Sequence, residues 1–154
     1  MEQITTRKAT LKDLDILLDF EQNIIKAERP FDATLKDGHI NYYDIAYMIE
    51  APEVEVIVAE SGGEIVGSGY ARMQDAKIYY KHKKYAYLGF MYVKPEYRGK
   101  GVNKKVIEAL EAWCLSQNIT EIRLEVYNDN QSAVRAYEKT GFSKNLVEMR
   151  KGIR

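Results

Sequence analysis

The chain has 154 residues, of which 45% are hydrophobic and 30% charged, and its 23 Lys and Arg balance its 23 Asp and Glu. This length and composition are typical of one globular domain, which we expect to span residues 1–154. Zero formal net charge argues against a protein whose main role is to coat nucleic acid or an anionic membrane, so neither is expected as a partner.

Cysteine and histidine are too scarce for a disulfide framework or a metal cluster. Cys114 is the single cysteine, and His39 and His82 lack the spacing of metal ligands, so we expect no metal. The sequence contains neither the apolar core of a signal peptide nor about 18 consecutive apolar residues. A cytoplasmic location is therefore expected. The 12 tyrosines suggest a cleft or interface lined with aromatic rings.

The N-terminal part predicts a strand followed by two helices. Residues 4–7 form a short strand candidate. Thr10 and Asp13 resemble a capping box, and leucine and isoleucine then recur at helical spacing. Pro30 ends this helix, because the residue before a proline is disfavoured in the helical region. A weaker helix is expected within residues 36–50.

Three strands are predicted in the middle of the chain. Residues 54–60 alternate and are rich in valine, and a turn at 61–64 leads into a second strand over 65–73. The basic stretch 77–84 is interpreted as a solvated connection, or alternatively as a surface for an acidic acceptor or partner. Residues 85–93 are the longest aromatic and β-branched run and predict a central strand.

The C-terminal part predicts alternating helices and strands. A glycine-rich turn at 97–101 leads into a helix over 102–117, and a strand is expected over 121–127. A helix over 131–140 and a closing strand over 142–149 complete the chain. This order indicates an α/β fold with a mixed sheet and helices on both faces.

The turn after the central strand has the features of an anion site. Gly99 and Gly101 allow the backbone to approach oxygen atoms that a Cβ would keep away. Amide N–H groups at the start of the following helix attract anions, and Arg98, Lys100 and Lys104 add positive charge. The turn matches neither the P-loop nor the dinucleotide fingerprint, so by itself it is also compatible with a plain strand-to-helix turn.

Two motifs together make this region similar to a known family. Arg98-x-x-Gly101-x-Asn103 resembles the coenzyme-binding motif Q/R-x-x-G-x-G/A of the GNAT superfamily, except that Asn103 replaces its final small residue. The second signature of that superfamily is resembled by Asn130-x-x-Ala133-x-x-x-Tyr137-x-x-x-Gly141-Phe142. The resemblance implies a GNAT fold, in which a mixed, mostly antiparallel, twisted sheet of six to seven strands is flanked by about four helices.

The same resemblance implies an N-acetyltransferase that uses acetyl-CoA as the acyl donor. The acetyl group would pass by direct attack to a primary amine, which could belong to a small molecule, an amino acid or a peptide or protein N-terminus. A homodimer is an expectation from the superfamily. The alternative is a non-catalytic acyl-CoA sensor or scaffold on the same fold.

The resemblance also assigns residues to the coenzyme. The pantetheine arm would bond to main-chain groups near Met91 and Val93, and Asn130 would bond to the arm as well as capping its helix. The alternative for Asn130 is a cap alone. The diphosphate would lie on the backbone N–H groups of the turn, namely those of Arg98, Gly99, Lys100, Gly101, Val102 and Asn103.

Tyr137 is the candidate general acid, because a phenol near the coenzyme sulfur can protonate the thiolate that leaves. Its alternative role is packing under the sheet. The central strand has no Asp, Glu or His to serve as general base, so Glu28 is the candidate, with Asp32, Tyr92 or a water chain left open. Phe31 and Arg29, in the same loop, are candidates for the acceptor site.

Overall fold

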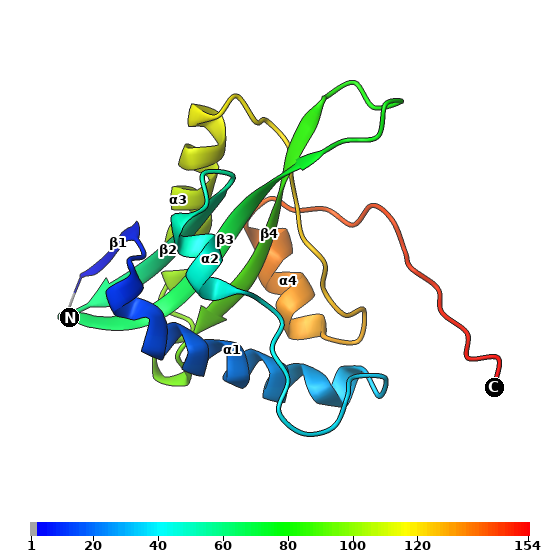
Figure 1. The fold of residues 1–154 in the computed structure, drawn as a ribbon, viewed down its shortest axis with the longest axis horizontal. Helices are drawn as coiled ribbons and strands as arrows, with labels where there is room; N and C mark the ends of the chain where they lie inside the picture. The colour runs from blue at the N-terminus through cyan, green and yellow to red at the C-terminus, as the bar shows by residue number, and fades with distance from the viewer. Residues whose placement is uncertain (1–2) are drawn as a thin grey trace.

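The protein, described over residues 3–154 in a computed structural model, is built on one five-stranded sheet of order β1-β2-β3-β4-β5. Neighbours among the first four strands are antiparallel, and β5 runs parallel to β4 (Figure 1). The mixed, mostly antiparallel sheet is thus confirmed. The strands are β1 (Ile4–Lys8), β2 (Val54–Ser61), β3 (Glu64–Asp75), β4 (Lys84–Val93) and β5 (Ile122–Arg123).

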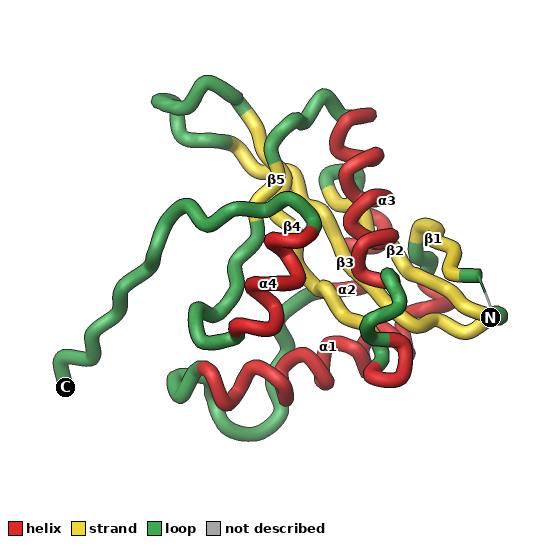
Figure 2. The backbone as a smooth tube through the Cα atoms, turned by 180° about the vertical axis from the view of Figure 1, so that it is seen from behind, coloured by secondary structure: helices red, strands yellow, loops and turns green. Residues whose placement is uncertain are grey.

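Four α-helices cover the sheet, as expected. They are α1 (Leu14–Glu28), α2 (Ile45–Glu50), α3 (Val102–Ser116) and α4 (Gln131–Lys139). Helices α1 and α2 lie against one face of the sheet and α3 against the other (Figures 1 and 2). Helix α4 lies beside the end of β4 on the open side of the sheet (Figure 2). None of the helices in residues 3–154 is long and apolar enough to cross a bilayer.

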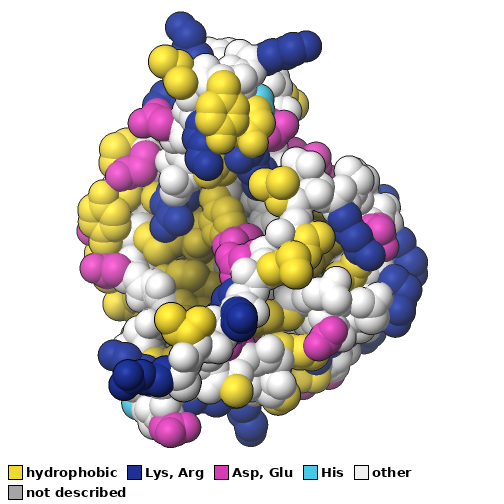
Figure 3. All heavy atoms as spheres, turned by 90° about the vertical axis from the view of Figure 1, so that its right-hand side faces the viewer, with side chains coloured by type: hydrophobic (Ala, Val, Ile, Leu, Met, Phe, Trp, Pro, Cys, Tyr) yellow, Lys and Arg dark blue, Asp and Glu magenta, His cyan; other side chains and the backbone are white. Residues whose placement is uncertain are grey.

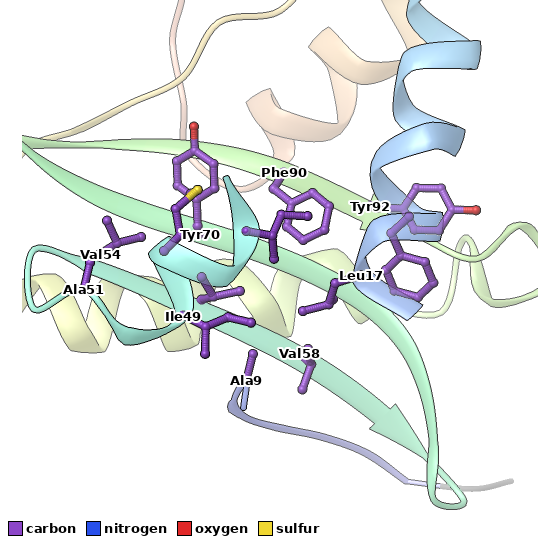
Figure 4. Packing of buried hydrophobic residues seen from close by; sticks show 13 residues of the cluster. Ala9, Leu17, Ile49, Ala51, Val54, Val58, Tyr70, Phe90 and Tyr92 are labelled. Carbon is purple, nitrogen blue, oxygen red and sulfur yellow. The ribbon is translucent and has the colours of Figure 1, made fainter. Parts of the chain in front are cut away.

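The strand periodicity of two divides the apolar residues between two cores. On β2, Val54, Val56 and Val58 face α1 and α2, whereas Ile57 and Ala59 face α3. The first core brings these valines against Leu17, Phe20 and Ile49 and against the rings of Tyr70, Phe90 and Tyr92 (Figure 4). Each fully buried Val, Leu, Ile or Phe contributes about 1.5–3 kcal/mol relative to exposure.

The start and end of α1 follow the predicted signals. The backbone N–H of Thr10 donates to the Asp13 carboxylate over 2.8 Å, and Arg7 donates to both oxygens of that carboxylate. These contacts lower the pKa of Asp13, chiefly through Arg7. The α-helix ends at Glu28, and Pro30 lies in the single 3₁₀ turn that follows. The capping box is confirmed and begins a 3₁₀ turn (Leu11–Asp13) that α1 continues. The helix end before Pro30 is also confirmed, but Arg29 keeps helical dihedral angles, so the expected exclusion of the residue before the proline is not the cause.

Two strand predictions are wrong. The strand expected over 121–127 is only two residues long, and the segment 142–149 is extended without a strand partner, so the sheet has five strands instead of six or seven. Residues 143–154 leave the body and are exposed (Figures 1 and 2). A segment with strand-like sequence becomes a strand only when a neighbour supplies the ladder, and residues 3–142 place none beside it.

Candidate active site

The sheet opens between β4 and β5. These two strands pair only at Ala86 with Ile122 and at Tyr87 with Arg123. From Leu88 to Val93, β4 has no strand partner on that side within residues 3–154. Alternate backbone N–H and C=O groups of a strand point to each side, so this edge of β4 presents free groups to a ligand. Met91 and Val93, the residues assigned to the pantetheine arm, lie on this edge.

A β-bulge shapes β4 at the same place. Ser68 pairs with Tyr92 and Tyr70 with Gly89, so two residues, Phe90 and Met91, lie opposite one residue of β3. Phe90 has a φ of +57°, which is rare for a residue with a side chain. The buried Ser68 hydroxyl donates to the Phe90 carbonyl over 2.9 Å. The bulge was not predicted from the sequence, although Gly67 and Gly69 in β3 and Gly89 in β4 were a signal for it.

The turn that leads into α3 has the geometry of an anion cradle. Gly99 and Gly101 have φ values of +77° and +80°, and a Cβ at either position would meet no atom within 4 Å. The glycines therefore serve the backbone conformation and leave open space in front of it. Gly101 is the N-cap of α3 without a side-chain cap, so the first N–H groups of the helix point outward unpaired. These features fit a phosphate group.

Arg98 is fixed at the edge of this cradle. Its Nε donates to the carbonyl of Val93 over 3.1 Å, and its guanidinium lies 6.0 Å from the ring centre of Tyr92. The side chain of Asn103 is partly exposed. The arginine thus links the end of β4 to the turn and places a positive charge between the two predicted parts of the coenzyme site.

Helix α4 carries the second motif. The Asn130 side chain accepts from the N–H of Ala133 over 3.3 Å, and Gly141 has a φ of +102° just past the helix end. Asn130 therefore acts as the N-cap. Tyr137 packs edge-on against Phe142 with ring centres 5.8 Å apart. Burial, together with the charge of Glu28, raises the pKa of Tyr137 to about 12, so its phenol keeps its proton at neutral pH.

Glu28 lies at the end of α1 among tyrosines from distant parts of the chain. Burial raises the pKa of this half-buried carboxyl. The charge of Glu28 in turn raises the pKa values of four tyrosine hydroxyls, those of Tyr42, Tyr43, Tyr127 and Tyr137. The charge of Glu28 thus acts on Tyr137, although the two residues are far apart in sequence.

Asp32 has a different environment. Its carboxylate accepts hydrogen bonds from Thr34 and, over 3.0 Å each, from Tyr127 and Arg150. These hydrogen bonds, of which the one from Thr34 has the largest effect, hold the pKa of Asp32 far below its usual range. A carboxylate so stabilised is a poor proton acceptor. Asp32 instead connects the loop after α1 with the segment after β5, where Phe31 stacks on Tyr127 with ring centres 6.0 Å apart.

Arg29 and Tyr92 also have fixed partners. Arg29 donates to the carbonyls of Lys36 and Gly38 and so folds the loop between α1 and α2. Tyr92 is buried, and its hydroxyl accepts from the Asn23 amide over 3.2 Å. Both residues therefore support the walls of the cleft.

The face of the sheet beside this cluster is a hollow with an aromatic floor. The half-buried rings of Tyr43 and Tyr87 flank the ring of Tyr70, which is buried in the core, and their centres lie 5.5 Å and 6.4 Å from its centre. Tyr70 lies over Gly89, where a Cβ would come within 2.6 Å of its ring. Figure 3 shows the hollow with a hydrophobic floor, acidic side chains at its edge and basic side chains around it. Such a surface suits a cationic molecule with an apolar chain.

The remaining candidates lie outside this cleft. Cys114 is buried in the core under α3, and burial raises the pKa of its thiol to about 11, as expected for a packing residue. His82 contacts Glu121 at 3.1 Å and Arg123 at 3.0 Å, which fastens the basic 77–84 connection to the region of β5. Residues 3–154 contain no group of three His, Cys, Asp or Glu arranged to hold a metal ion.

Comparison with known families agrees with this geometry. The family model described as "Acetyltransferase (GNAT) family" matches residues 20–142, which include both motifs and the whole of β4. The chain belongs to the GNAT acetyltransferase family. The match extends from within α1 to Phe142 and leaves out the exposed segment 143–154.

Individual relatives of this GNAT protein match in part of the sequence or in fold. Thialysine N-epsilon-acetyltransferase of Sus scrofa is 39% identical over 62 residues, which are 40% of this chain and 36% of the pig protein. The chain thus matches about a third of that relative's length. A tetramutant of the BH1408 protein of Bacillus halodurans has a TM-score of 0.84 at 16% identity, covering 97% of this chain and 99% of that one. A predicted acetyltransferase with acetyl-CoA from Clostridium acetobutylicum has a TM-score of 0.70 at 21% identity, covering 96% of both chains.

Proposed function

We propose that this chain is an enzyme that transfers the acetyl group of acetyl-CoA to a primary amine by direct attack. The observation that carries the proposal is that Tyr137, on the helix beside the end of β4, lies within reach of the charge of Glu28, while β4 keeps an unpaired edge. The raised pKa of Tyr137 keeps its phenol protonated, as a general acid requires, and the raised pKa of Glu28 makes its carboxylate a stronger base than usual. Membership of the family and the name of the pig relative support the reaction class.

Binding of the coenzyme would use backbone groups. The turn from Arg98 to Asn103 fits the diphosphate because its N–H groups are unpaired and open space lies before its glycines. The free groups of β4 near Met91 and Val93 would bond the pantetheine arm, and Asn130, which caps the start of α4, would bond it as well. Acetyl-CoA supplies an acetyl group activated as a thioester.

Proton movements would be divided between the two side chains. An amine is protonated at neutral pH and must lose a proton before it attacks. Glu28 takes that proton, since its raised pKa makes it a better base than an ordinary carboxylate. A backbone N–H near Met91 stabilises the developing charge on the carbonyl oxygen. As the bond from the carbonyl carbon to sulfur breaks, Tyr137 gives its proton to the departing sulfur, and its phenolate takes the second proton from the nitrogen of the new amide.

Replacement of Tyr137 tests the mechanism. Tyr137→Phe should lower turnover by about 10²–10⁴-fold, because the leaving sulfur loses its proton donor while the ring and its packing remain. The measurement is release of CoA thiol from acetyl-CoA across amino acids, polyamines, aminoglycosides and short peptides. Calorimetry should show unchanged binding of acetyl-CoA.

Tyr79→Phe is the matched control, since Tyr79 is exposed on the connection between β3 and β4. Equal turnover in wild type and Tyr137→Phe would remove Tyr137 from the chemistry. Binding of acetyl-CoA without release for any acceptor would instead favour the sensor alternative.

A further inference from the structure

A positive and a negative side chain, Arg72 and Glu125, both contact Tyr87 in the hollow and form no salt bridge with each other. Arg72 on β3 is the cross-strand neighbour of Tyr87 on β4. The Arg72 guanidinium lies 5.8 Å from the ring centres of both Tyr70 and Tyr87. Its polar partner is the neutral side-chain amide of Gln74, whose oxygen lies 2.7 Å from Nε in the amide orientation that gives both of its atoms suitable partners. Within residues 3–154, no carboxylate lies within salt-bridge distance of Arg72.

Glu125 is the opposite charge. It follows β5 and accepts a hydrogen bond from the Tyr87 hydroxyl over 3.0 Å. Across the described chain, no Lys, Arg or His forms a salt bridge with it, and its side chain is exposed. Other arginines on the sheet do pair with acids, as Arg7 does with Asp13 and Glu60 and Arg123 with Glu121. Arg72 and Glu125 are therefore a free cation and a free anion at one end of an aromatic floor.

The position of this pair relates it to the proposed chemistry. Tyr87 precedes the bulge at Phe90 by three residues, or about 10 Å of strand. The ring of Tyr70, which is buried in the core, separates the half-buried rings of Tyr87 and Tyr43, and the charge of Glu28 acts on the Tyr43 hydroxyl. A molecule lying across the exposed parts of Tyr87 and Tyr43 would place one end between Arg72 and Glu125 and the other toward Glu28.

We propose that Arg72 and Glu125 bind the α-carboxylate and α-ammonium groups of a free amino acid whose side-chain amine is the acceptor. Arginine matches a carboxylate with two parallel hydrogen bonds, and a glutamate accepts from an ammonium. The tyrosine rings would cover the aliphatic part of the side chain. This inference rests on the proposed function and narrows its acceptor to one chemical class.

Three acceptors that carry the same reactive amine test the roles of Arg72 and Glu125 separately. L-lysine carries both head groups, cadaverine lacks the carboxylate, and 6-aminohexanoate lacks the second amine. Wild-type kcat/KM should be highest for L-lysine by about tenfold over either analogue, since a hydrogen bond to a charged group is typically worth about this factor. Mass spectrometry should place the new acetyl group on the side-chain nitrogen.

Two variants should give a crossed pattern. Arg72→Gln should lower kcat/KM for L-lysine and 6-aminohexanoate and leave cadaverine unchanged. Glu125→Gln should lower it for L-lysine and cadaverine and leave 6-aminohexanoate unchanged. Glu148→Gln, in the exposed segment 143–154, is the control and should change none of the three. Circular dichroism and melting curves verify that the variants fold.

Several results would overturn the inference. Equal kcat/KM for the three acceptors, or the same loss of kcat/KM for all three in both variants, would show that Arg72 and Glu125 do not bind the carboxylate and ammonium groups. Transfer to n-pentylamine as efficient as transfer to L-lysine would keep the proposed function but reject the amino-acid site. If no amine is acetylated, calorimetry with CoA-loaded protein decides: the inference requires L-lysine binding that Arg72→Gln weakens, and its absence rejects the site as well.

Discussion

At the scale of single residues, Glu28 gains its properties from its surroundings. It lies at the end of a helix, where a carboxylate would normally be solvated, but the folded chain half buries it among tyrosines. Burial disfavours the charged form and raises the pKa. Asp32, four residues later, has a lowered pKa because Thr34, Arg150 and Tyr127 donate to it. Glu28 is thus the candidate base, whereas Asp32 is an anion with a structural role.

Glu28→Gln should change both activity and the pH dependence of stability. The raised pKa means that the folded state favours the protonated acid, so the contribution of Glu28 to stability is present below its ordinary pKa of about 4.5 and is lost as pH rises through the folded-state pKa. The neutral variant does not suffer this loss. Its melting temperature relative to wild type should therefore increase from pH 4 to pH 8.

The same variant should reduce turnover and remove the acidic limb of the pH–rate profile, because the base is gone. Thermal melts and initial rates from pH 4 to 8 measure both effects. Glu138→Gln on the exposed side of α4 is the control. A difference in melting temperature that stays constant with pH would contradict the environment assigned to Glu28.

At the scale of elements, the bulge in β4 controls the shape of the site. Strand β4 keeps its pairing with β3 along its length by placing two of its residues opposite one residue of β3. At this bulge and beyond it, β4 no longer pairs with β5. Ser68 holds the bulge from the neighbouring strand. The free edge that would bind the pantetheine arm therefore depends on a contact made by β3.

Ser68→Ala should weaken both the fold and coenzyme binding. It removes the partner of the buried Phe90 carbonyl, which should lower the free energy of unfolding by about 1–3 kcal/mol. Relaxation of the bulge should raise the Kd for acetyl-CoA several-fold. Denaturant titration and calorimetry measure these changes. Ser116→Ala is the control, since Ser116 is exposed and bonds within its own helix. Unchanged acetyl-CoA binding in Ser68→Ala would separate the bulge from the site.

At the scale of the whole molecule, the segment 143–154 is extended and largely unsupported. Four of its apolar side chains are 82–90% exposed, namely Leu146, Val147, Met149 and Ile153. Arg150 ties the segment to the body through Asp32 and Thr34. The outer edge of β5 also lacks a strand partner within residues 3–154. An unpaired extended segment and an open sheet edge favour association between copies.

We expect the chain to form the homodimer implied by its family through this segment. Light scattering should give twice the mass of one chain, and removal of residues 145–154 should give a monomer with unchanged far-ultraviolet circular dichroism. The Leu146→Ser, Met149→Ser double variant should weaken the dimer without shortening the chain. A monomeric full chain at high concentration, or a truncated chain that still dimerises, would be incompatible with this role.

The sequence by itself determined the elements that depend on local chemistry. The capping box at Thr10, the glycine turn before α3 and the asparagine cap of α4 follow from neighbouring residues, and all were found where the sequence placed them. The two family motifs are of the same kind, because each is a short segment that carries its own geometry. The fold class was therefore predictable from the chain, and so was the turn that we propose as the coenzyme cradle.

Only the tertiary structure decided features that need partners distant in sequence. Residues 142–149 have a strand-like pattern and yet form no strand, because no neighbour completes their ladder. Nothing near Glu28 in sequence indicates that it meets Tyr137, and the free pair of Arg72 and Glu125 exists only because three strands bring it to Tyr87. Strand pairing, desolvation and charge proximity are set by the packing of the whole chain, so the acceptor side of the site emerged only from the fold.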